Sequence, residues 1–272
     1  MYGLIGDPVE HSISPIMQNT AFRHSGVDAV YVTFEVKRQY LKQAVAGAIA
    51  LGIRGLNVTL PHKIRIMQYL SSLDREALKI GSVNTVVNHK GSLTGFNTDG
   101  VGALQSVGIE RLRGSSLLLL GSGGAARAIA HTFAPEVKRM MIINRTLSEA
   151  QRLRRTLNRS YRSKVTSTGL TPLRLKEFVD KADLIVNASS MGMKGVNDPP
   201  IRRSWLHPNQ VVFDIVYNPP LTMLLRNARS AGAQTINGLE MLLNQGAASF
   251  KLWTGKNAPI TEMRAALSQN VG

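Results

Sequence analysis

Two polar strings near the start of the chain contain side chains that can bind a small acid. Ser12 and Ser14 present hydroxyl groups two residues apart at an expected helix start, where hydroxyls and backbone amides favour a carboxylate. The string from Asn57 to Lys63 lies at the carboxyl end of a short strand and brings an amide, a hydroxyl and an ammonium group close together. Ligand-binding residues gather at such strand ends in α/β proteins.

Two further strings repeat these groups and add a carboxylate. One runs from Ser82 to Thr85, and the other runs from Asn97 to Gly100 and contains Asp99. Each string alone also fits ordinary turn chemistry, with Ser14 and Asp99 as helix caps. Together the strings supply hydroxyls, amides, one Lys and one Asp, which suits a small, hydroxyl-rich acid as ligand.

A nucleotide-binding βαβ unit is predicted in the middle of the chain. The apolar run Leu117–Leu120 leads into a glycine-rich turn and a helical run, and a second apolar strand, Met140–Ile143, closes the unit. Gly121 suits the tight turn, Gly123 allows close approach of a pyrophosphate, and Ala126 allows close packing of helix on strand. The amides at the helix start then face the anion.

The residues after the second strand favour NADP over NAD. An NAD enzyme usually places an acid there to bind the ribose hydroxyls, whereas this chain has Asn144 and Arg145. A guanidinium attracts a 2′-phosphate and can bond it through two N–H groups, and an acid would repel it. We therefore predict NADP as the cofactor.

Composition excludes several classes of protein. The chain has 272 residues, enough for two ordinary domains, and no apolar stretch reaches the length of a membrane span. The first residues show no secretory signal, so we expect a cytoplasmic protein with no membrane partner. There is no Cys, which excludes disulfides, thiolate metal sites and cysteine nucleophiles, and we predict no metal site.

The net charge of +16 raises the question of a nucleic-acid partner. The basic residues are scattered and lack the interleaved aromatic side chains on which bases would stack. A positive field that attracts an anionic cofactor and an anionic substrate explains the excess of Lys and Arg. We expect no nucleic-acid partner.

The pattern of apolar residues predicts alternating strands and helices. In the first part, Ser14 and Pro15 are expected to cap and begin a helix that ends at Gly26, and Ala29–Val36 is expected to be a strand with Val30, Val32, Phe34 and Val36 on one face. The remaining expected elements are a helix at 41–51 closed by Gly52, a strand at 55–58, a hairpin of 83–87 with 92–96, a helix from 101, strands at 184–187 and 211–216, and helices at 239–253 and 260–267.

These elements predict an α/β protein of two domains. We expect an amino-terminal α/β substrate domain made of residues 1–100 and 239–272, to which the carboxyl-terminal helices return. Residues 101–238 are expected to form a doubly wound, Rossmann-type NADP-binding domain.

The chain resembles a known family, the shikimate dehydrogenases of the shikimate/quinate dehydrogenase superfamily. The resemblance runs along nearly the whole chain and rests on ordered strings. They are the Ser-x-Ser pair at 12–14, NVTLPHK from Asn57, GSVNT from Gly81, NTDG from Asn97, GSGGAARA from Gly121, NRT from Asn144, NASSMGM from Asn187, DIVYNPPLT from Asp214, GLEMLLNQG from Gly238 and FKLWTG from Phe250.

The resemblance implies an activity and a set of site residues. The activity is the reversible, NADPH-dependent reduction of 3-dehydroshikimate to shikimate, a step of aromatic amino-acid biosynthesis. Lys63 and Asp99 would form the catalytic pair, in which either residue can hold the transferred proton. Substrate would be bound by Ser12, Ser14, Thr59, Lys63, Asn84, Asp99, Tyr217 and Gln245, and cofactor by Gly121, Ser122, Gly123, Gly124, Ala125, Asn144, Arg145, Thr146, Ile215 and Gly238.

One residue departs from the family pattern. Family members commonly have a basic residue three positions after Thr146, where this chain has Glu149. The exchange removes one cation from the expected 2′-phosphate site, and Arg152 is a candidate to replace it. His62 lies inside a family string, and we expect it to serve geometry rather than proton transfer.

Two alternatives stay open. A quinate/shikimate dehydrogenase that uses NAD would belong to the same superfamily, but Asn144 and Arg145 argue against it. A protein that senses nucleotides or binds nucleic acid without catalysis would fit the charge, but it would have no need for Lys63 and Asp99. A homodimer is the expected assembly.

Overall fold

The computed structural model describes residues 1–161 and 164–270, and the chain forms two compact units. The first unit contains residues 1–102 and the described residues from 243 onward, and the second contains residues 103–242. The predicted boundaries, after residues 100 and 238, fall two to four residues earlier. The difference arises because both divisions lie inside helices, α4 (Asp99–Val107) and α10 (Gly238–Thr254), where no turn residue marks them.

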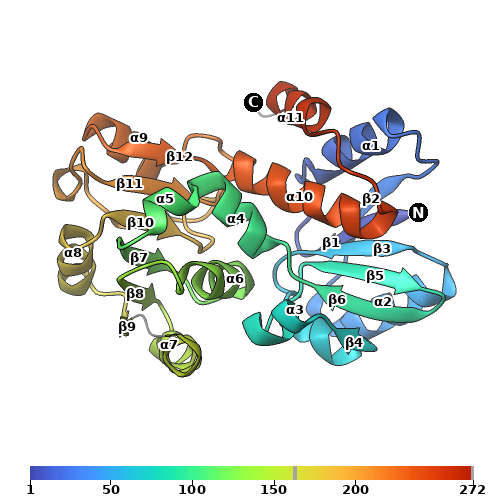
Figure 1. Ribbon diagram of the computed structural model, residues 1–272, viewed down its shortest axis with the longest axis horizontal. Coiled ribbons are helices and arrows are strands. Elements are labelled where there is room, and N and C mark those ends of the chain that lie inside the picture. Colours follow the sequence, from blue (N-terminus) through green and yellow to red (C-terminus); the bar gives the residue numbers. More distant parts are fainter. Residues whose placement is uncertain (162–163, 271–272) are drawn as a thin grey trace. The chain divides into compact units, whose positions relative to one another are not determined.

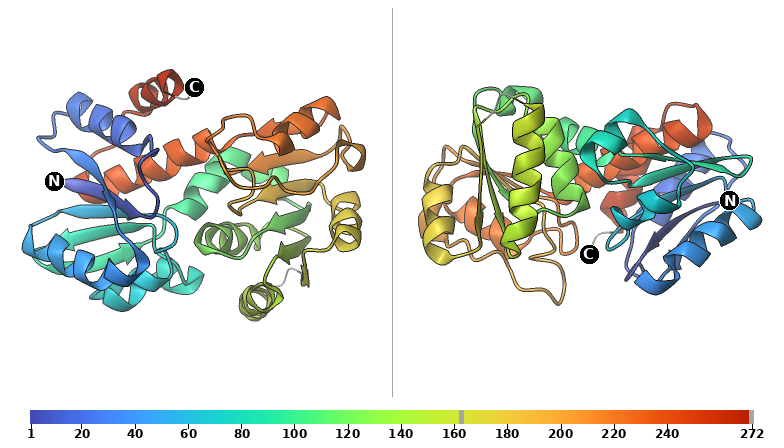
Figure 2. Two further views of the ribbon diagram at one scale, coloured as in Figure 1. Left: turned by 180° about the vertical axis from the view of Figure 1, so that it is seen from behind. Right: turned by 90° about the horizontal axis from the view of Figure 1, so that it is seen from below.

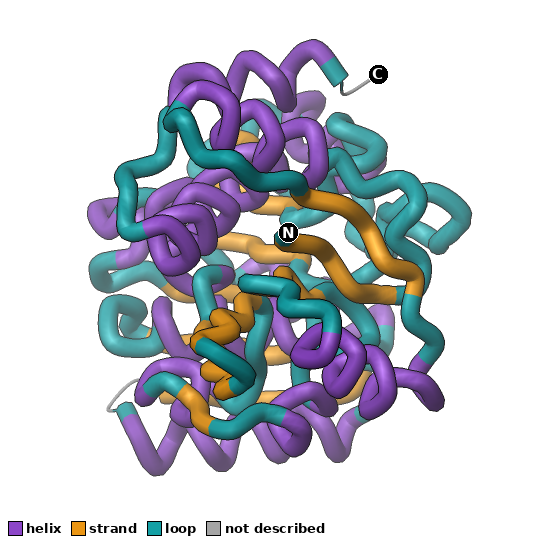
Figure 3. Tube along the Cα trace, turned by 90° about the vertical axis from the view of Figure 1, so that its right-hand side faces the viewer, coloured by secondary structure: helices purple, strands orange, loops and turns teal. Residues whose placement is uncertain are grey.

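The first unit contains a six-stranded mixed sheet in the order β2-β1-β3-β5-β6-β4. In Figure 3, the orange strands beside the N-terminus belong to this sheet. Strands β1, β2 and β3 are parallel, and β5 and β6 form the expected antiparallel hairpin. Its two turn residues, Lys90 and Gly91, both have positive φ. The strands are β1 (Tyr2–Gly6), β2 (Tyr31–Glu35), β3 (Gly55–Val58), β4 (Ser72–Leu73), β5 (Thr85–His89) and β6 (Ser92–Phe96).

Helices cover both faces of this sheet. Leu41 and Val45 of α2 and Ala77 of α3 join one apolar cluster with strand residues such as Leu56 and Val86. On the other face, aromatic side chains of α1 and α10 pack against β1. The rings of Tyr2 and Phe22 lie 5.1 Å apart, and those of Tyr2 and Trp253 lie 5.0 Å apart. The helices are α1 (Ser14–His24), α2 (Leu41–Ala50), α3 (Arg75–Ile80), α10 and α11 (Ile260–Gln269), with 3-10 turns at Arg38–Tyr40 and Arg65–Tyr69.

Two local predictions in this unit are wrong in detail. Ser14 is the first residue of α1 rather than its cap, because the capping position is Ile13 and the Ser14 amide donates to the Ser12 hydroxyl. The second prediction placed Val30, Val32, Phe34 and Val36 together on one face of a strand at 29–36, and only part of this face is buried. Val36 is buried, but Val30 precedes the strand and is 45% exposed, because β2 lies at the edge of the sheet.

The second unit contains a six-stranded parallel sheet in the order β12-β11-β10-β7-β8-β9. The strand order reverses between β7 and β10, so this is the doubly wound arrangement expected from the sequence, and ligands bind at such a switch point. Strand β11 ends at Asp214 rather than at Val216. The strands are β7 (Ser116–Leu120), β8 (Arg139–Asn144), β9 (Lys164–Gly169), β10 (Leu184–Asn187), β11 (Val211–Asp214) and β12 (Gln234–Ile236).

Helices lie on both faces of the parallel sheet as well (Figures 1 and 2). Leu117 and Leu119 of β7 pack against α6 and α7 on one face, whereas Leu118 and Leu120 pack against α8 and α9 on the other. Each central strand is therefore buried on both sides, as its continuous apolar run predicts. The helices of this unit, besides α4, are α5 (Ile109–Leu112), α6 (Gly124–Phe133), α7 (Leu147–Ser160), α8 (Pro172–Asp180) and α9 (Met223–Ser230), with a 3-10 turn at Arg203–Trp205.

Gly55 tests the packing of α10 on the first sheet. A Cβ atom at Gly55 would overlap the indole ring of Trp253, whose Nε1 donates to the Val86 carbonyl at 3.0 Å. We expect Gly55→Ala to lower the free energy of unfolding by about 1–3 kcal/mol, because the indole must move. Urea denaturation of the full chain, followed by circular dichroism, measures this change.

The matched control for this substitution is Gly47→Ala. Gly47 lies inside α2, and a Cβ atom added there would meet nothing within 4 Å. There Ala should stabilise the chain by up to about 1 kcal/mol through its higher helix propensity. Equal effects of the two substitutions would contradict the packing described for Trp253.

Candidate functional site

The polar strings of the first unit gather at one edge of its sheet. The loops that follow β1, β3 and β6 leave the carboxyl ends of strands that run in the same direction, and they carry Ser12 with Ser14, Thr59 with Lys63, and Asp99. Strand β5 runs the opposite way, so Asn84, which precedes it, lies at the same edge. The direction of the strands therefore explains why residues distant in sequence share one site.

Lys63 and Asp99 form an ion pair at this edge. The Nζ atom of Lys63 lies 2.5 Å from Oδ2 of Asp99, and the two side chains are 17% and 4% exposed. The other carboxylate oxygen, Oδ1, accepts a hydrogen bond of 2.9 Å from Asn84. Asp99 is therefore fixed from both sides, while Lys63 keeps some contact with solvent and can meet a substrate.

The amide of Asn84 is at the centre of a buried hydrogen-bond network. Its Nδ2 also donates to Thr98 and to Oε1 of Gln245, at 2.9 and 3.1 Å. Its Oδ1 accepts from the Thr98 amide at 2.7 Å. The network thus joins four of the predicted site residues directly: Lys63, Asn84, Asp99 and Gln245.

A second layer of polar residues holds the network in place. Ser249 and Thr85 share a hydrogen bond of 2.7 Å, and Asn57 donates to both of them. The hydroxyl of Tyr31 donates to Asn57 at 2.8 Å. Sequence reasoning missed Tyr31 and Ser249 as supporting residues. The only signal was that Ser249 follows Gln245 by one helical turn in α10.

The other predicted substrate residues, Ser12, Ser14, Thr59 and Tyr217, lie outside the hydrogen bonds described for Asn84. Ser12 and Ser14 are joined by the hydrogen bond from the Ser14 amide to the Ser12 hydroxyl, 3.3 Å long. Thr59 lies against Gly6 at the end of β1, and the Asp7 amide donates to the Leu60 carbonyl, so the loops after β1 and β3 are neighbours. Tyr217 belongs to the second unit.

His62 is fully buried, and its Nε2 lies 2.5 Å from the carbonyl oxygen of Val36. This contact ties the loop after β3 to the end of β2. It supports the expected geometric role of His62, because a buried ring that bonds a backbone carbonyl holds the loop that carries Lys63.

The glycine-rich turn of the second unit has the features that a bound pyrophosphate needs. Gly121 has φ +113°, and a Cβ atom there would lie 2.7 Å from the Ala188 carbonyl oxygen. Gly123 is exposed, a Cβ atom added to it would meet nothing within 4 Å, and it directly precedes the first turn of α6. The open space and the helix amides together fit a phosphate group. Ala126 is buried against the sheet, as expected.

The carboxylate of Glu149, in the first turn of α7, lies among hydrogen-bond donors at the end of β8. Oε2 of Glu149 accepts hydrogen bonds from Ser122 at 3.3 Å and from Asn144 at 3.2 Å, both of which are predicted cofactor residues. Arg145 and Thr146 are exposed beside them. Glu149 therefore lies next to the positions expected to bind the adenosine end of the cofactor.

A cationic residue that the sequence did not single out lies near this end of β8. Burial lowers the pKa of Arg127, the nearby Arg152 lowers it further, and Glu149 acts in the opposite direction. The Nε atom of Arg127 is buried with no hydrogen-bond partner among the described residues. Arg127 and Arg152 thus provide positive charge around Glu149, which favours an anion nearby. Its place in the first turn of α6 was the signal for Arg127.

The residues predicted near the nicotinamide lie on adjoining backbone. A Cβ atom at Gly238 would overlap the carbonyl of Ile215, so the two predicted residues touch through their main chains. Ile215 and Tyr217 both belong to the segment between β11 and α9.

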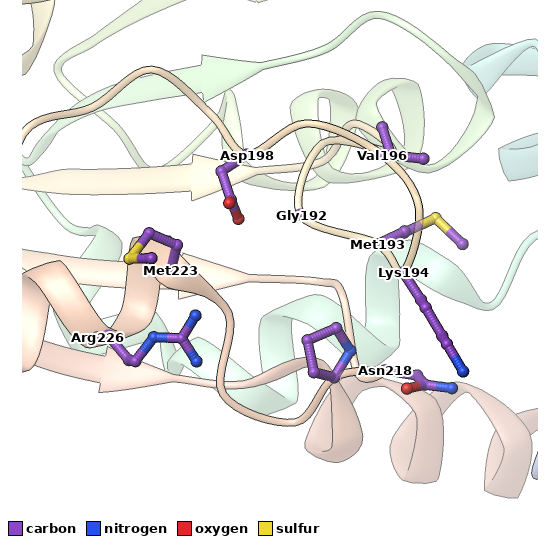
Figure 4. A pocket seen from close by; sticks show the side chains of 9 residues that line it. Gly192, Met193, Lys194, Val196, Asp198, Asn218, Met223 and Arg226 are labelled. Atoms are coloured by element: carbon purple, nitrogen blue, oxygen red, sulfur yellow. The ribbon is translucent and has the colours of Figure 1, made fainter.

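A pocket of about 240 Å³ opens beside that segment, on the side of Asn218 and Met223 (Figure 4). Its other wall is the loop that contains Gly192 and Asp198, and none of the predicted cofactor residues lines it. Among residues 1–161 and 164–270, no three His, Asp or Glu side chains come together as metal ligands. No helix in the same ranges has the length and apolar character to cross a membrane.

Comparison with known proteins identifies the family. The shikimate dehydrogenase substrate-binding domain matches residues 4–86, the shikimate/quinate 5-dehydrogenase domain matches residues 103–240, and the shikimate 5′-dehydrogenase C-terminal domain matches residues 238–267. A shikimate dehydrogenase (NADP⁺) of Methanopyrus kandleri is 44% identical over 99% of this chain and 95% of its own length.

Solved structures agree with these matches. A shikimate dehydrogenase crystallised with NADP⁺ has a TM-score of 0.91 and 41% identity, and the alignment covers 100% of this chain and 95% of that one. A shikimate 5-dehydrogenase of Listeria monocytogenes, in complex with shikimate and NAD, has a TM-score of 0.86 and 36% identity, with 98% and 95% covered. By sequence and by fold, the chain belongs to the shikimate/quinate dehydrogenase family.

Proposed function

We propose that this chain is a shikimate dehydrogenase that reduces 3-dehydroshikimate to shikimate with NADPH, and that it catalyses the reverse oxidation. The observation that carries the proposal is the Lys63–Asp99 ion pair, which is joined through Asn84 to Gln245. This grouping offers an ammonium, a carboxylate and two amides to one small ligand. The Methanopyrus kandleri relative is named as an NADP⁺ enzyme, and the solved structure with 41% identity holds NADP⁺.

The chemistry requires a proton as well as a hydride. When bound, NADPH supplies the hydride for the keto carbon. The oxygen on that carbon gains negative charge, which the ammonium of Lys63 stabilises, and the Lys63–Asp99 pair provides the proton. Because Asn84 holds Asp99 through Oδ1, the Oδ2 atom stays directed at Lys63. Ser12 and Ser14 are assigned to the substrate carboxylate, and Thr59, Tyr217 and Gln245 to its hydroxyl groups.

The residues of the second unit fit the cofactor. The first turn of α6 and the space at Gly123 suit the pyrophosphate, with Ser122, Gly124 and Ala125 completing the turn. Asn144, Arg145 and Thr146 are assigned to the adenosine phosphate, and Ile215 and Gly238 to the nicotinamide. From these assignments, the first unit binds most of the substrate and the second unit binds NADP. The cytoplasmic location and the homodimer stay predictions.

Replacement of Lys63 tests the catalytic assignment. We expect Lys63→Met to lower kcat for shikimate oxidation by about 10²–10⁴-fold, because the positioned acid–base group is lost. The affinity for NADP should stay unchanged, because the assigned cofactor residues belong to the second unit. Initial rates followed through the absorbance of reduced nicotinamide measure both quantities.

Lys42→Met is the matched control for this test. Lys42 is exposed on α2, and its loss should leave kcat as it is in the unmodified chain. Full activity of the Lys63 variant would refute its catalytic role. Absence of shikimate oxidation by the unmodified chain with either cofactor would refute the proposed function itself.

Glu149 favours measurable use of NAD beside NADP. Its carboxylate lies among the groups assigned to the 2′-phosphate and repels that phosphate, while Arg127, Arg145 and Arg152 attract it. We expect Glu149→Gln to raise the ratio of kcat/KM with NADP to that with NAD by about three- to tenfold. Parallel steady-state kinetics with the two cofactors measure the ratio.

The control for this cofactor test is Glu110→Gln, because Glu110 is exposed on α5 and forms a surface ion pair with Arg113. It should leave the cofactor ratio unchanged. A ratio that falls, or does not change, in the Glu149 variant would show that Glu149 does not oppose the 2′-phosphate.

A further inference from the structure

Asp214 is a buried carboxylate to which no part of the proposed mechanism gives a role. It is the last residue of β11, and it is fully buried. Its Oδ1 accepts hydrogen bonds from Asn187 at 2.9 Å and from the Val216 amide at 3.1 Å. Its Oδ2 accepts a bond of 2.7 Å from the Thr222 hydroxyl. All three partners are donors, so the carboxylate has three well-placed bonds.

These bonds reach both ends of the segment 215–221. Val216 lies at the start of the segment, and Thr222 follows its end and caps α9 by accepting from the Leu225 amide. The bond from Val216 also explains why β11 ends at Asp214, because that amide turns to the carboxylate instead of continuing the strand. Asp214 thus links the two ends of the segment through one side chain, and we call this carboxylate with its hydrogen bonds the anchor of the segment.

Asn187 extends this anchor to the neighbouring strand. It ends β10, and its Nδ2 donates both to Asp214 and to the Met191 carbonyl, while its Oδ1 accepts from the Ser189 hydroxyl. The loops after β10 and β11 are therefore held by a single pair of side chains. Both loops leave the carboxyl edge of the parallel sheet, where ligands bind in this architecture.

We propose that Asp214 is a positioning residue whose carboxylate fixes both ends of segment 215–221 and so sets how that segment meets the nicotinamide end of the cofactor. The inference rests on the proposed function, which assigns Ile215 and Tyr217 to the reacting end of the site. Gly238 supports it, because its backbone lies directly against Ile215 and leaves the segment little room to shift.

The surroundings of Asp214 make this anchor sensitive to pH. Burial raises its pKa to about 6, and the nearby Asp198 adds to the rise, while the bonds from Thr222, Val216 and Asn187 oppose it. The groups that contact it from β10, the segment and α9 are uncharged. Asp198 comes from the loop after β10, and Figure 4 shows its carboxylate directed into the pocket beside the segment.

Protonation weakens all three bonds. A proton on Oδ2 makes that oxygen the donor, so the bond to Thr222 reverses and the Thr222 hydroxyl must turn to accept it. The two bonds to Oδ1 remain, but they no longer end on a charged group, and hydrogen bonds to a neutral acceptor are weaker. Acid therefore weakens the hold of Asp214 on the segment, and the nicotinamide end of the cofactor should bind less well below about pH 6.

Asp214→Asn reproduces the protonated state at every pH. The amide oxygen can keep the bonds from Asn187 and Val216, and the amide nitrogen donates towards Thr222 as the protonated acid does. Because burial raises the folded-state pKa, Asp214 favours the fold most at low pH, and this contribution is lost as pH rises through about 6. The variant should therefore fold at pH 8 with no lower unfolding midpoint.

The test compares two ligands on the full chain between pH 5 and pH 8. NADP carries the nicotinamide, whereas 2′-phospho-ADP-ribose has the same 2′-phosphate and pyrophosphate and lacks only the nicotinamide. The 2′-phosphate gains a proton at roughly pH 6 in both ligands, so its effect cancels when the ratio of the two dissociation constants is compared. We expect the unmodified chain to lose about three- to tenfold in NADP affinity relative to 2′-phospho-ADP-ribose below pH 6. Asp214→Asn should show the weakened ratio at every pH.

Asp183→Asn is the matched control. Asp183 accepts a bond from the Ser116 amide just before β10, at the opposite edge of the sheet, and its variant should behave as the unmodified chain. An Asp214 variant with unchanged NADP affinity at pH 8, or with equal losses for both ligands, would overturn the inference. If the unmodified chain did not oxidise shikimate, the proposed function would fail, but this binding comparison would still decide the role of Asp214.

Discussion

The ion pair between Lys63 and Asp99 is the interaction on which the site depends. A buried carboxylate is stable only when it is paired and hydrogen-bonded, and here Lys63 and Asn84 meet that need on its two oxygens. Asn84 in turn is held by Thr98 and Gln245. The cost of burying the charge therefore explains why so many polar groups converge, and the convergence leaves one ammonium in a fixed place with access to a ligand.

Strand direction brings these groups together, and it does so separately in each unit. In the first sheet, three strands running the same way end at the edge that carries Lys63 and Asp99. In the second sheet, all strands are parallel, and the glycine turn, the Asn187–Asp214 pair and the segment after β11 follow their carboxyl ends. Gly121 and Gly238 complete the second site, because the backbones of Ala188 and Ile215 lie so close to them that a side chain would not fit.

Local patterns in the sequence predict the strands, the glycine turn and the polar strings, because each is encoded by neighbouring residues. They do not predict the partners of those strings. Asn84 bonds Gln245 across 161 residues, and Ser249 supports Asn57 across 192, so only the tertiary structure joins them. The same limit applies to Glu149, whose bond to Ser122 could not be predicted from its position in α7. The predicted cap of α1 is wrong by one residue, because Ile13 holds the capping position and the Ser14 amide donates to the Ser12 hydroxyl.

A double-mutant cycle between Lys63 and Asp99, measured as kcat for shikimate oxidation with saturating NADP, tests the catalytic pair most directly. Residues that act as a unit show strongly non-additive losses. We therefore expect Lys63→Met combined with Asp99→Asn to lower kcat about as much as the more damaging single substitution. Losses that multiply would mean that the two residues act independently, and the ion pair would then not be the catalytic unit.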